Sequence, residues 1–131
     1  MIVDPSALVA IVFQQSDAER YAEALADART PSLLPAPGYL EASIVIDGLR
    51  DPVVGYQLDA LIKASRIRIE PFTEEQARIA RQAYRDFGRG SGHPAKLNFG
   101  DCISFAMAKA LGEPLLYKGN DFGHTGIRSA L

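Results

Sequence analysis

The stretch Leu97–Phe122 reads LNFGDCISFAMAKALGEPLLYKGNDF, and it decides the fold of this chain. Its pattern predicts a tight turn at Gly100, a helix that ends at Gly112, a short buried strand and a second turn. Acidic residues occupy two of the junctions, because Asp101 begins the helix and Asp121 follows the strand. In a parallel α/β sheet, ligands bind outside the carboxyl ends of the strands. We therefore expect both acids to face one pocket.

The rest of the chain repeats this alternation of short apolar strands and helices. The expected strands are residues 1–3, 32–34, 67–72 and 114–117. The expected helices are residues 6–13, 17–29, 39–49, 52–64, 74–89 and 101–111. Capping boxes are expected where Ser16 pairs with Glu19 and where Thr73 pairs with Gln76. Strands that alternate with helices predict an α/β fold, a parallel sheet covered by helices on both faces.

Size and composition predict a single domain over residues 1–131. The hydrophobic content of 47% and charged content of 23% are ordinary for a soluble globular protein. The net charge of −2 gives no whole-molecule sign of nucleic-acid binding, so any such site must be local. Cys102 is the single cysteine, which excludes an intrachain disulfide. Without a signal-like or membrane-spanning segment, we expect a soluble cytoplasmic protein with no membrane partner.

Four acids fall at one end of the predicted sheet. Asp4 and Asp121 come just past strands, and Glu41 and Asp101 lie near helix starts. Clustered carboxylates resist ionising together, and a hard cation such as Mg²⁺ offsets that cost. Such a cluster can hold one or two metals that activate water and stabilise a phosphodiester transition state. Taken singly, each acid also has a structural interpretation, as a helix cap or as a first-turn residue that the helix dipole favours.

Four motifs lie in order along the chain, and their combination is specific. They are MIVDPSALVA at 1–10, YLEA at 39–42, LNFGDC at 97–102 and PLLYKGNDF at 114–122. Together they resemble the motifs of PIN-domain ribonucleases, particularly the VapC-type toxins of type II toxin–antitoxin pairs. The resemblance implies a three-layer α/β/α sandwich with a central parallel sheet.

The resemblance also assigns roles to individual residues. It implies that Asp4, Glu41, Asp101 and Asp121 are both the catalytic acids and the metal ligands. Ser6 matches a hydroxyl residue beside the first acid, where it can steady a metal-bound water or a carboxylate. A local hydrogen bond to the helix start is an equal alternative for Ser6. The implied reaction is Mg²⁺- or Mn²⁺-dependent endoribonucleolytic hydrolysis of RNA by metal-activated water, without a covalent enzyme intermediate.

Three kinds of partner are implied by the same resemblance. One is an RNA substrate, with transfer and ribosomal RNA as candidates. The second is a small antitoxin whose carboxyl-terminal segment covers the acidic groove, and the third is a second copy of the chain, docked through the helices between Tyr39 and Ala64. The sequence does not identify the RNA, because that choice depends on loops and groove shape outside the acids.

Four positions depart from the family pattern. Pro5 and Lys118 replace hydroxyl residues that many relatives carry, and Gly119 and Gly126 stand where some relatives carry another acid. None of these changes removes one of the four acids. Together they leave the number of metals and their affinity open.

Basic residues suggest a further contact with RNA. Arginines follow one face of the helix expected at 74–89, either as a stripe for RNA phosphates or, the interpretation we favour, as an ordinary solvated face. They are Arg78, Arg81, Arg85 and Arg89. Arg89 and Lys96 flank a glycine-rich loop and could follow a bound RNA strand.

Two other classes of protein compete with the nuclease. A phosphoacceptor receiver domain also binds Mg²⁺ beside an aspartate at a strand end, and Lys118 could imitate its late lysine. A receiver needs that aspartate on a central strand in mid-chain, where this sequence has none. The second alternative is an RNA-binding module that keeps the fold but lacks nuclease activity.

Overall fold

The computed structural model describes all 131 residues. The strands are β1 (Ile2–Val3), β2 (Leu33–Pro35), β3 (Arg68–Glu70) and β4 (Leu115–Leu116). The helices are α1 (Pro5–Val12), α2 (Ala18–Ala26), α3 (Ala36–Asp47), α4 (Pro52–Ala64), α5 (Glu74–Phe87) and α6 (Phe99–Leu111), followed by a 3₁₀ turn, η1 (Asp121–His124). None of the helices combines the length and the apolar character that a membrane crossing needs.

The four strands form one parallel sheet in the order β3-β2-β1-β4. Ile2 of β1 lies opposite Leu33 of β2 on one side and Leu115 of β4 on the other. Because all four strands run the same way, the segments that follow them leave from one edge of the sheet. Asp4 and the segment that leads to Asp121 therefore start at this edge, as the sequence predicts.

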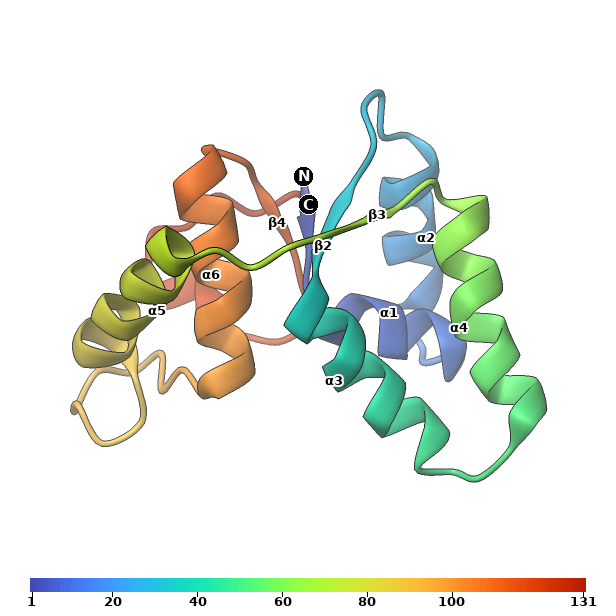
Figure 1. Cartoon of the computed structure of the whole chain (residues 1–131), viewed down its shortest axis with the longest axis horizontal. Helices are drawn as coiled ribbons and strands as arrows, with labels where there is room; N and C mark the ends of the chain where they lie inside the picture. The colour runs from blue at the N-terminus through green and yellow to red at the C-terminus, as the bar shows by residue number, and fades with distance from the viewer.

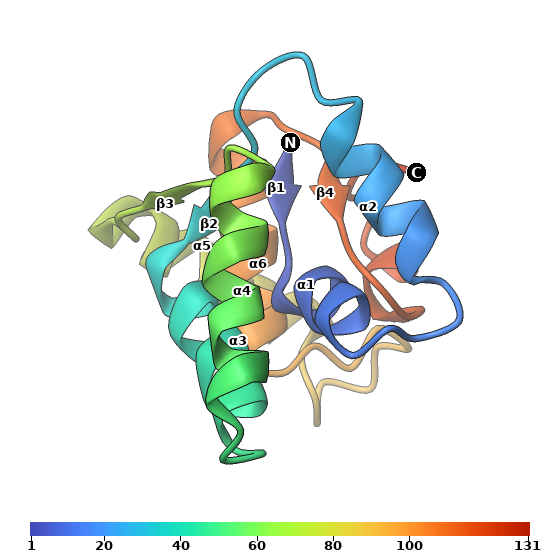
Figure 2. The same cartoon turned by 90° about the vertical axis from the view of Figure 1, so that its right-hand side faces the viewer.

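Helices cover both faces of the sheet (Figures 1 and 2). Successive strand residues point to opposite faces, so Val3 and Leu116 join the core beneath α1 to α4. Ile2 and Leu115 join the second core, beneath α5 and α6. In Figure 1, α5 and α6 lie on one side of the strands, and α1, α2 and α4 lie on the other. The predicted three-layer α/β/α arrangement is confirmed.

The helix starts differ from prediction at α3 and α6. The helix expected from Tyr39 begins at Ala36, because prolines fit the first turn of a helix and Pro37 occupies its second position. Glu41 therefore lies in the second turn of α3, and its assignment to the first turn is wrong. The turn expected at Gly100 is also wrong, because α6 begins at Phe99 and includes that glycine.

The two predicted capping boxes have opposite outcomes. Thr73 and Gln76 form theirs at the start of α5, with hydrogen bonds of 3.1 and 3.3 Å. The box expected for Ser16 and Glu19 is wrong, because α2 begins at Ala18 with Asp17 at the N-cap position. The Asp17 side chain makes no capping bond there and binds elsewhere in the molecule.

Candidate active site

Asp4 is the buried acid of the site, and it sits where β1 passes into α1. As the N-cap of α1, its Oδ2 accepts hydrogen bonds from the Ser6 amide at 3.0 Å and the Ser6 hydroxyl at 2.5 Å. Its Oδ1 accepts from the Ser104 hydroxyl at 2.5 Å. Burial raises the pKa of Asp4, and the three serine hydrogen bonds oppose that rise. Its carboxylate is therefore fixed from both sides.

Ser6 makes the local bond that its structural interpretation requires, and it also makes a second contact. Its Oγ accepts a hydrogen bond of 3.0 Å from the backbone amide of Lys118, just beyond β4. The hydroxyl thus links Asp4 to the segment that carries Asp121. This is a positioning contact between two of the strand ends.

Asp101 belongs to a capping box at the start of α6. Its Oδ2 accepts from the Asn98 amide at 3.0 Å, and the Asn98 Oδ1 accepts from the Asp101 amide at 2.9 Å. Burial raises the pKa of Asp101 to about 6, and the charges of Asp4 and Asp121 add to the rise, whereas the Asn98 amide and the Arg89 charge oppose it. The structural interpretation of Asp101 is thus correct, and its charge is also coupled to the other acids.

Glu41 reaches this group from α3. It is an exposed residue, but its carboxylate lies against the backbone of Gly100, where protein atoms shield it on one side. A Cβ at position 100 would lie 2.8 Å from Glu41 Cδ, so only glycine leaves room for this approach. Partial burial raises the pKa of Glu41, followed by the charges of Asp4 and Asp101.

Asp121 is the most peripheral of the four acids. It is exposed at the start of η1 and makes no capping bond there, so its structural interpretation as a cap is wrong. Its charge nevertheless helps to raise the pKa of Asp101. No three His, Cys, Asp or Glu side chains lie in an arrangement that could hold a metal ion. The acids therefore interact through their charges, and the metal site stays a prediction.

Ser104 is a positioning residue that the sequence did not reveal. It is completely buried in the middle of α6, 100 residues from the aspartate to which it donates. Within an apolar helix, serine ordinarily bonds its own backbone, so nothing local distinguishes this residue. Only the packing of α6 against β1 brings its hydroxyl to Asp4.

Lys118, a departure from the family pattern, holds the far end of α1 to the end of β4. Its Nζ donates to Gln15 Oε1 at 2.6 Å and to Asp17 Oδ1 at 2.8 Å. The hydrogen bond from Lys118 is the main cause of the lowered pKa of Asp17. The lysine therefore ties the segment after β4 to the loop between α1 and α2.

Cys102 belongs to the core beneath α5 and α6. It is buried, and burial, aided by the charge of Asp101, raises the pKa of its thiol to about 11. The thiol is therefore protonated and unreactive at neutral pH.

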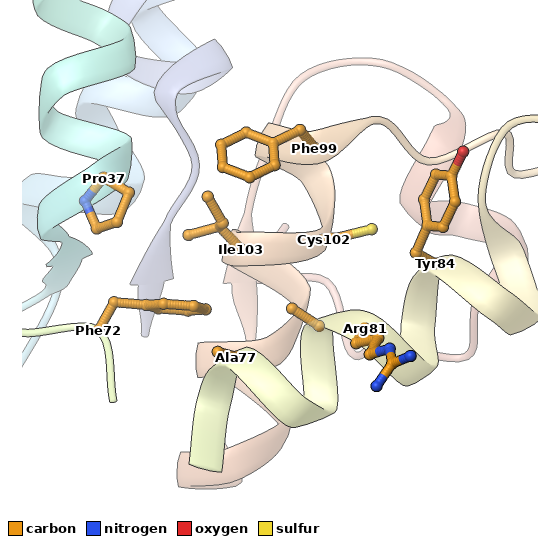
Figure 3. Close-up of a pocket in the computed structure, with 9 residues that line it drawn as sticks. Pro37, Phe72, Ala77, Arg81, Tyr84, Phe99, Cys102 and Ile103 are labelled. Carbon is orange, nitrogen blue, oxygen red and sulfur yellow. The ribbon is translucent and has the colours of Figure 1, made fainter. Parts of the chain in front are cut away.

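An apolar groove of about 480 Å³ lies beside the acids, between α5 and α6. Figure 3 shows the side chains of Phe72, Phe99 and Ile103 gathered along it. Phe99, which has 83% of its surface exposed, also borders a second hollow, which Glu41 helps to line. The apolar groove is thus continuous with the surface around the acids.

The class of the protein follows from comparison with protein families. The family described as PIN domain matches residues 1–127. The chain therefore belongs to the PIN domain family. This membership decides against the receiver domain.

Its relatives within that family are VapC ribonucleases. Ribonuclease VapC28 of Mycobacterium tuberculosis is 59% identical over 131 residues, covering 100% of this chain and 98% of that protein. Ribonuclease VapC42 of the same organism is 49% identical, covering 99% of this chain and 98% of that protein. The resemblance seen in the four motifs is confirmed.

Solved structures agree on the fold. The crystal structure of Mycobacterium tuberculosis VapC20, described as a sarcin–ricin loop cleaving toxin, has a TM-score of 0.74 at 18% identity, covering 96% of this chain and 95% of that one. A toxin–antitoxin complex from Klebsiella pneumoniae has a TM-score of 0.70 at 16% identity, covering 99% of this chain and 97% of that one. At these identities the likeness concerns the fold alone.

Proposed function

We propose that this VapC-family chain is an endoribonuclease toxin whose active site is the acidic cluster, defined as Asp4, Glu41, Asp101 and Asp121. The observation that carries the proposal is the coupling among these acids. Asp4 raises the pKa of both Glu41 and Asp101, although the three residues come from different elements of the fold. Acids held together at such a cost are typical of functional sites.

The chemistry of these residues fits a divalent metal. Every candidate ligand is a carboxylate oxygen, which Mg²⁺ and Mn²⁺ prefer over nitrogen or sulfur. Only one carboxylate oxygen of Asp101 accepts the capping hydrogen bond, so its other oxygen can bind a metal ion. A bound divalent cation would offset the repulsion, activate the attacking water and stabilise negative charge that develops on the phosphate oxygens. We propose Mg²⁺ or Mn²⁺ in this role.

The chain's own residues hold the acids in place. Ser6 and Ser104 fix the two oxygens of Asp4, and the capping box fixes Asp101 at the start of α6. Gly100 allows the carboxylate of Glu41 to approach α6. Such preorganisation places the charges before the RNA binds, so less reorganisation is needed during the reaction.

An RNA cleavage assay tests this proposal. Wild-type protein, Asp101→Asn and the exposed control Asp27→Asn are incubated with labelled total RNA in Mg²⁺, Mn²⁺ or EDTA. We expect cleavage by wild type and the control with a divalent metal, and none by Asp101→Asn or in EDTA. The same RNA profile for wild type and Asp101→Asn, with and without EDTA, would refute the proposal. Mapping the cut sites shows whether transfer or ribosomal RNA is the substrate.

The apolar groove supports an antitoxin as the protein partner. An exposed phenylalanine beside the acidic cluster is suited to anchor a segment that covers the site. We propose that a small antitoxin, encoded by a short reading frame beside the gene, occupies this groove. In co-purification with that product, Phe99→Asp should lower the affinity roughly tenfold or more, and Leu131→Asp, an exposed apolar control, should not. Equal recovery with both variants would place the antitoxin elsewhere.

A further inference from the structure

The loop between α5 and α6 forms a separate, cationic hollow that the acidic cluster does not use. This hollow, of about 430 Å³, is lined by no apolar residue. Its lining residues are Arg89, Gly90, Gly92, His93 and Lys96. We call it the cationic loop pocket. Its composition is opposite to that of the apolar groove, so it fits a different ligand.

Hydrogen bonds within the loop hold its shape. A parallel bridge joins Gly88 to Leu97 at its base. Above the base, the Ser91 hydroxyl donates to the Gly88 carbonyl at 2.6 Å and accepts from the His93 amide at 3.2 Å. The pocket is therefore largely preorganised, which lowers the entropy cost of binding a ligand.

Two glycines open the backbone of the pocket. Gly90 and Gly92 have φ angles of +87° and +85°, which side-chain-bearing residues rarely adopt. No atom lies within 4 Å of the place where a Cβ would stand at either position. A ligand can therefore approach the backbone of this loop closely.

The polar side chains of the pocket are donors without an acceptor. Arg89 and Lys96 take part in none of the four ion pairs of the molecule. The Nδ1 of His93 accepts a hydrogen bond of 3.1 Å from the Ala95 amide, so the proton of the neutral ring is on Nε2. The ring is held by an edge contact with Phe87, with centroids 4.9 Å apart. Two cations and one oriented N–H donor suit an oxyanion.

The pocket lies next to the acidic cluster. The loop runs directly into α6, whose third residue is Asp101, and the charge of Arg89 reaches that carboxylate. A polyanion that crosses the cluster is therefore within reach of the loop. The acids repel phosphate groups, so an RNA enzyme with this site needs cations beside it.

We propose that the cationic loop pocket binds a backbone phosphate of the RNA, on one side of the bond that is cleaved. The inference rests on the proposed function, and it names the part of the chain that holds the substrate. Phosphate contacts position a nucleic acid without reading its sequence, so the pocket sets the register of the strand and not the choice of base.

RNA binding without cleavage tests this inference. Both compared variants carry Asp101→Asn, and the probe is a fluorescently labelled pool of short single-stranded RNA of random sequence. One variant adds Arg89→Gln and Lys96→Gln. The matched control adds Arg29→Gln and Lys63→Gln, which remove the same charge at exposed positions outside the pocket. Thermal melts check that all proteins stay folded.

We expect the pocket variant to bind RNA about tenfold more weakly than the control, as the loss of charge-assisted hydrogen bonds predicts. The slope of log affinity against log salt should become shallower by about 0.7, the value for one phosphate contact on a single strand. Equal affinity and slope for the two variants overturn the inference. The inference is also overturned if inorganic phosphate binds in the pocket and raises the melting temperature while the pocket substitutions leave RNA binding unchanged.

Cleavage is measured separately, with Asp101 restored, so that the two ideas fail separately. If the pocket variant binds RNA more weakly but wild type does not cleave RNA, the proposed nuclease activity is wrong and the proposed phosphate site is supported. Cleavage by wild type that the pocket substitutions leave unchanged at low RNA concentration rejects the phosphate site and keeps the nuclease.

Discussion

Two acids of the candidate site cap helices and also contribute to the negative charge of the site. Asp4 caps α1 and Asp101 completes the capping box of α6, yet both raise the pKa of Glu41. Helix starts offer free amides and positive dipole ends, so they stabilise negative charge there. The structural and catalytic interpretations of these two acids are therefore compatible.

Gly100 gives a prediction at the scale of one residue. Gly100→Ala would push the Glu41 carboxylate away from α6, because the new Cβ would overlap it. We expect RNA cleavage to fall roughly a hundredfold, as for other misplaced catalytic groups, with little loss of stability. Gly38→Ala in α3 is the control, since its Cβ would meet Leu34 at an ordinary 3.4 Å. Cleavage rates that match for the two variants would contradict this role of Gly100.

Asp101 gives a prediction about pH. Its pKa is raised from 3.8 to about 6 on folding, so the metal-free folded chain binds a proton that the unfolded chain has released. The contribution of Asp101 to stability is therefore complete below about pH 4 and lost as the pH rises to about 6. In EDTA, urea denaturation of wild type should show this fall, and Asp101→Asn should show a smaller one, because Asp4 and Glu41 also have raised pKa values. A parallel pH dependence for both proteins would exclude the raised pKa.

At the scale of elements, the caps separate stability from activity. Thr73 is the N-cap of α5 and Asn98 is the N-cap of α6, each within a capping box, but only the second box contains an acid of the site. Thr73→Ala and Asn98→Ala should each lower the free energy of unfolding by about 1 kcal/mol. Only Asn98→Ala should also slow RNA cleavage, because Asp101 loses its partner. Urea denaturation and single-turnover cleavage measure the two effects.

The elements themselves were largely predictable. The apolar strands and the Thr73 capping box carry local patterns, and the structure confirms them. The start of α3 differs from prediction, because the helix begins at Ala36 and Pro37 fits its first turn. The box at Ser16 is wrong because α2 begins at Ala18 with Asp17 at the N-cap position, and the Asp17 side chain binds the distant Lys118 instead of the helix start. Local rules fail where a tertiary contact offers a stronger partner.

At the scale of the molecule, α3 and α4 present an apolar surface. Its large exposed residues are Leu40, Ile44, Val45, Leu49, Val53 and Tyr56. A surface of this kind on a small protein indicates an interface, so the homodimer proposed from the family resemblance has a candidate site here.

Substitutions on this surface test the dimer. Val53→Asp would place a charge among apolar neighbours, so we expect it to shift a dimer to monomer in sedimentation at micromolar concentration. Leu131→Asp, on a different surface, should leave the mass unchanged. A wild-type chain that sediments as a monomer would remove the homodimer from the proposal.

The alternation of strands and helices, the family, and the four acids proposed for the site follow from the amino-acid sequence alone. These features depend on local periodicity and on motifs that can be recognised without knowing how the chain packs. The stretch Leu97–Phe122 contains two of the acids and the capping box at the start of α6.

How these residues meet depends on the packing of the folded chain. It placed Ser104 on Asp4, the Glu41 carboxylate against Gly100, and the Lys118 amide on Ser6. Each contact joins residues from different elements, and two of them span more than 90 residues of chain. These contacts depend on how α3, α6 and β4 pack around β1, and no local pattern of residues specifies which distant segments pack together.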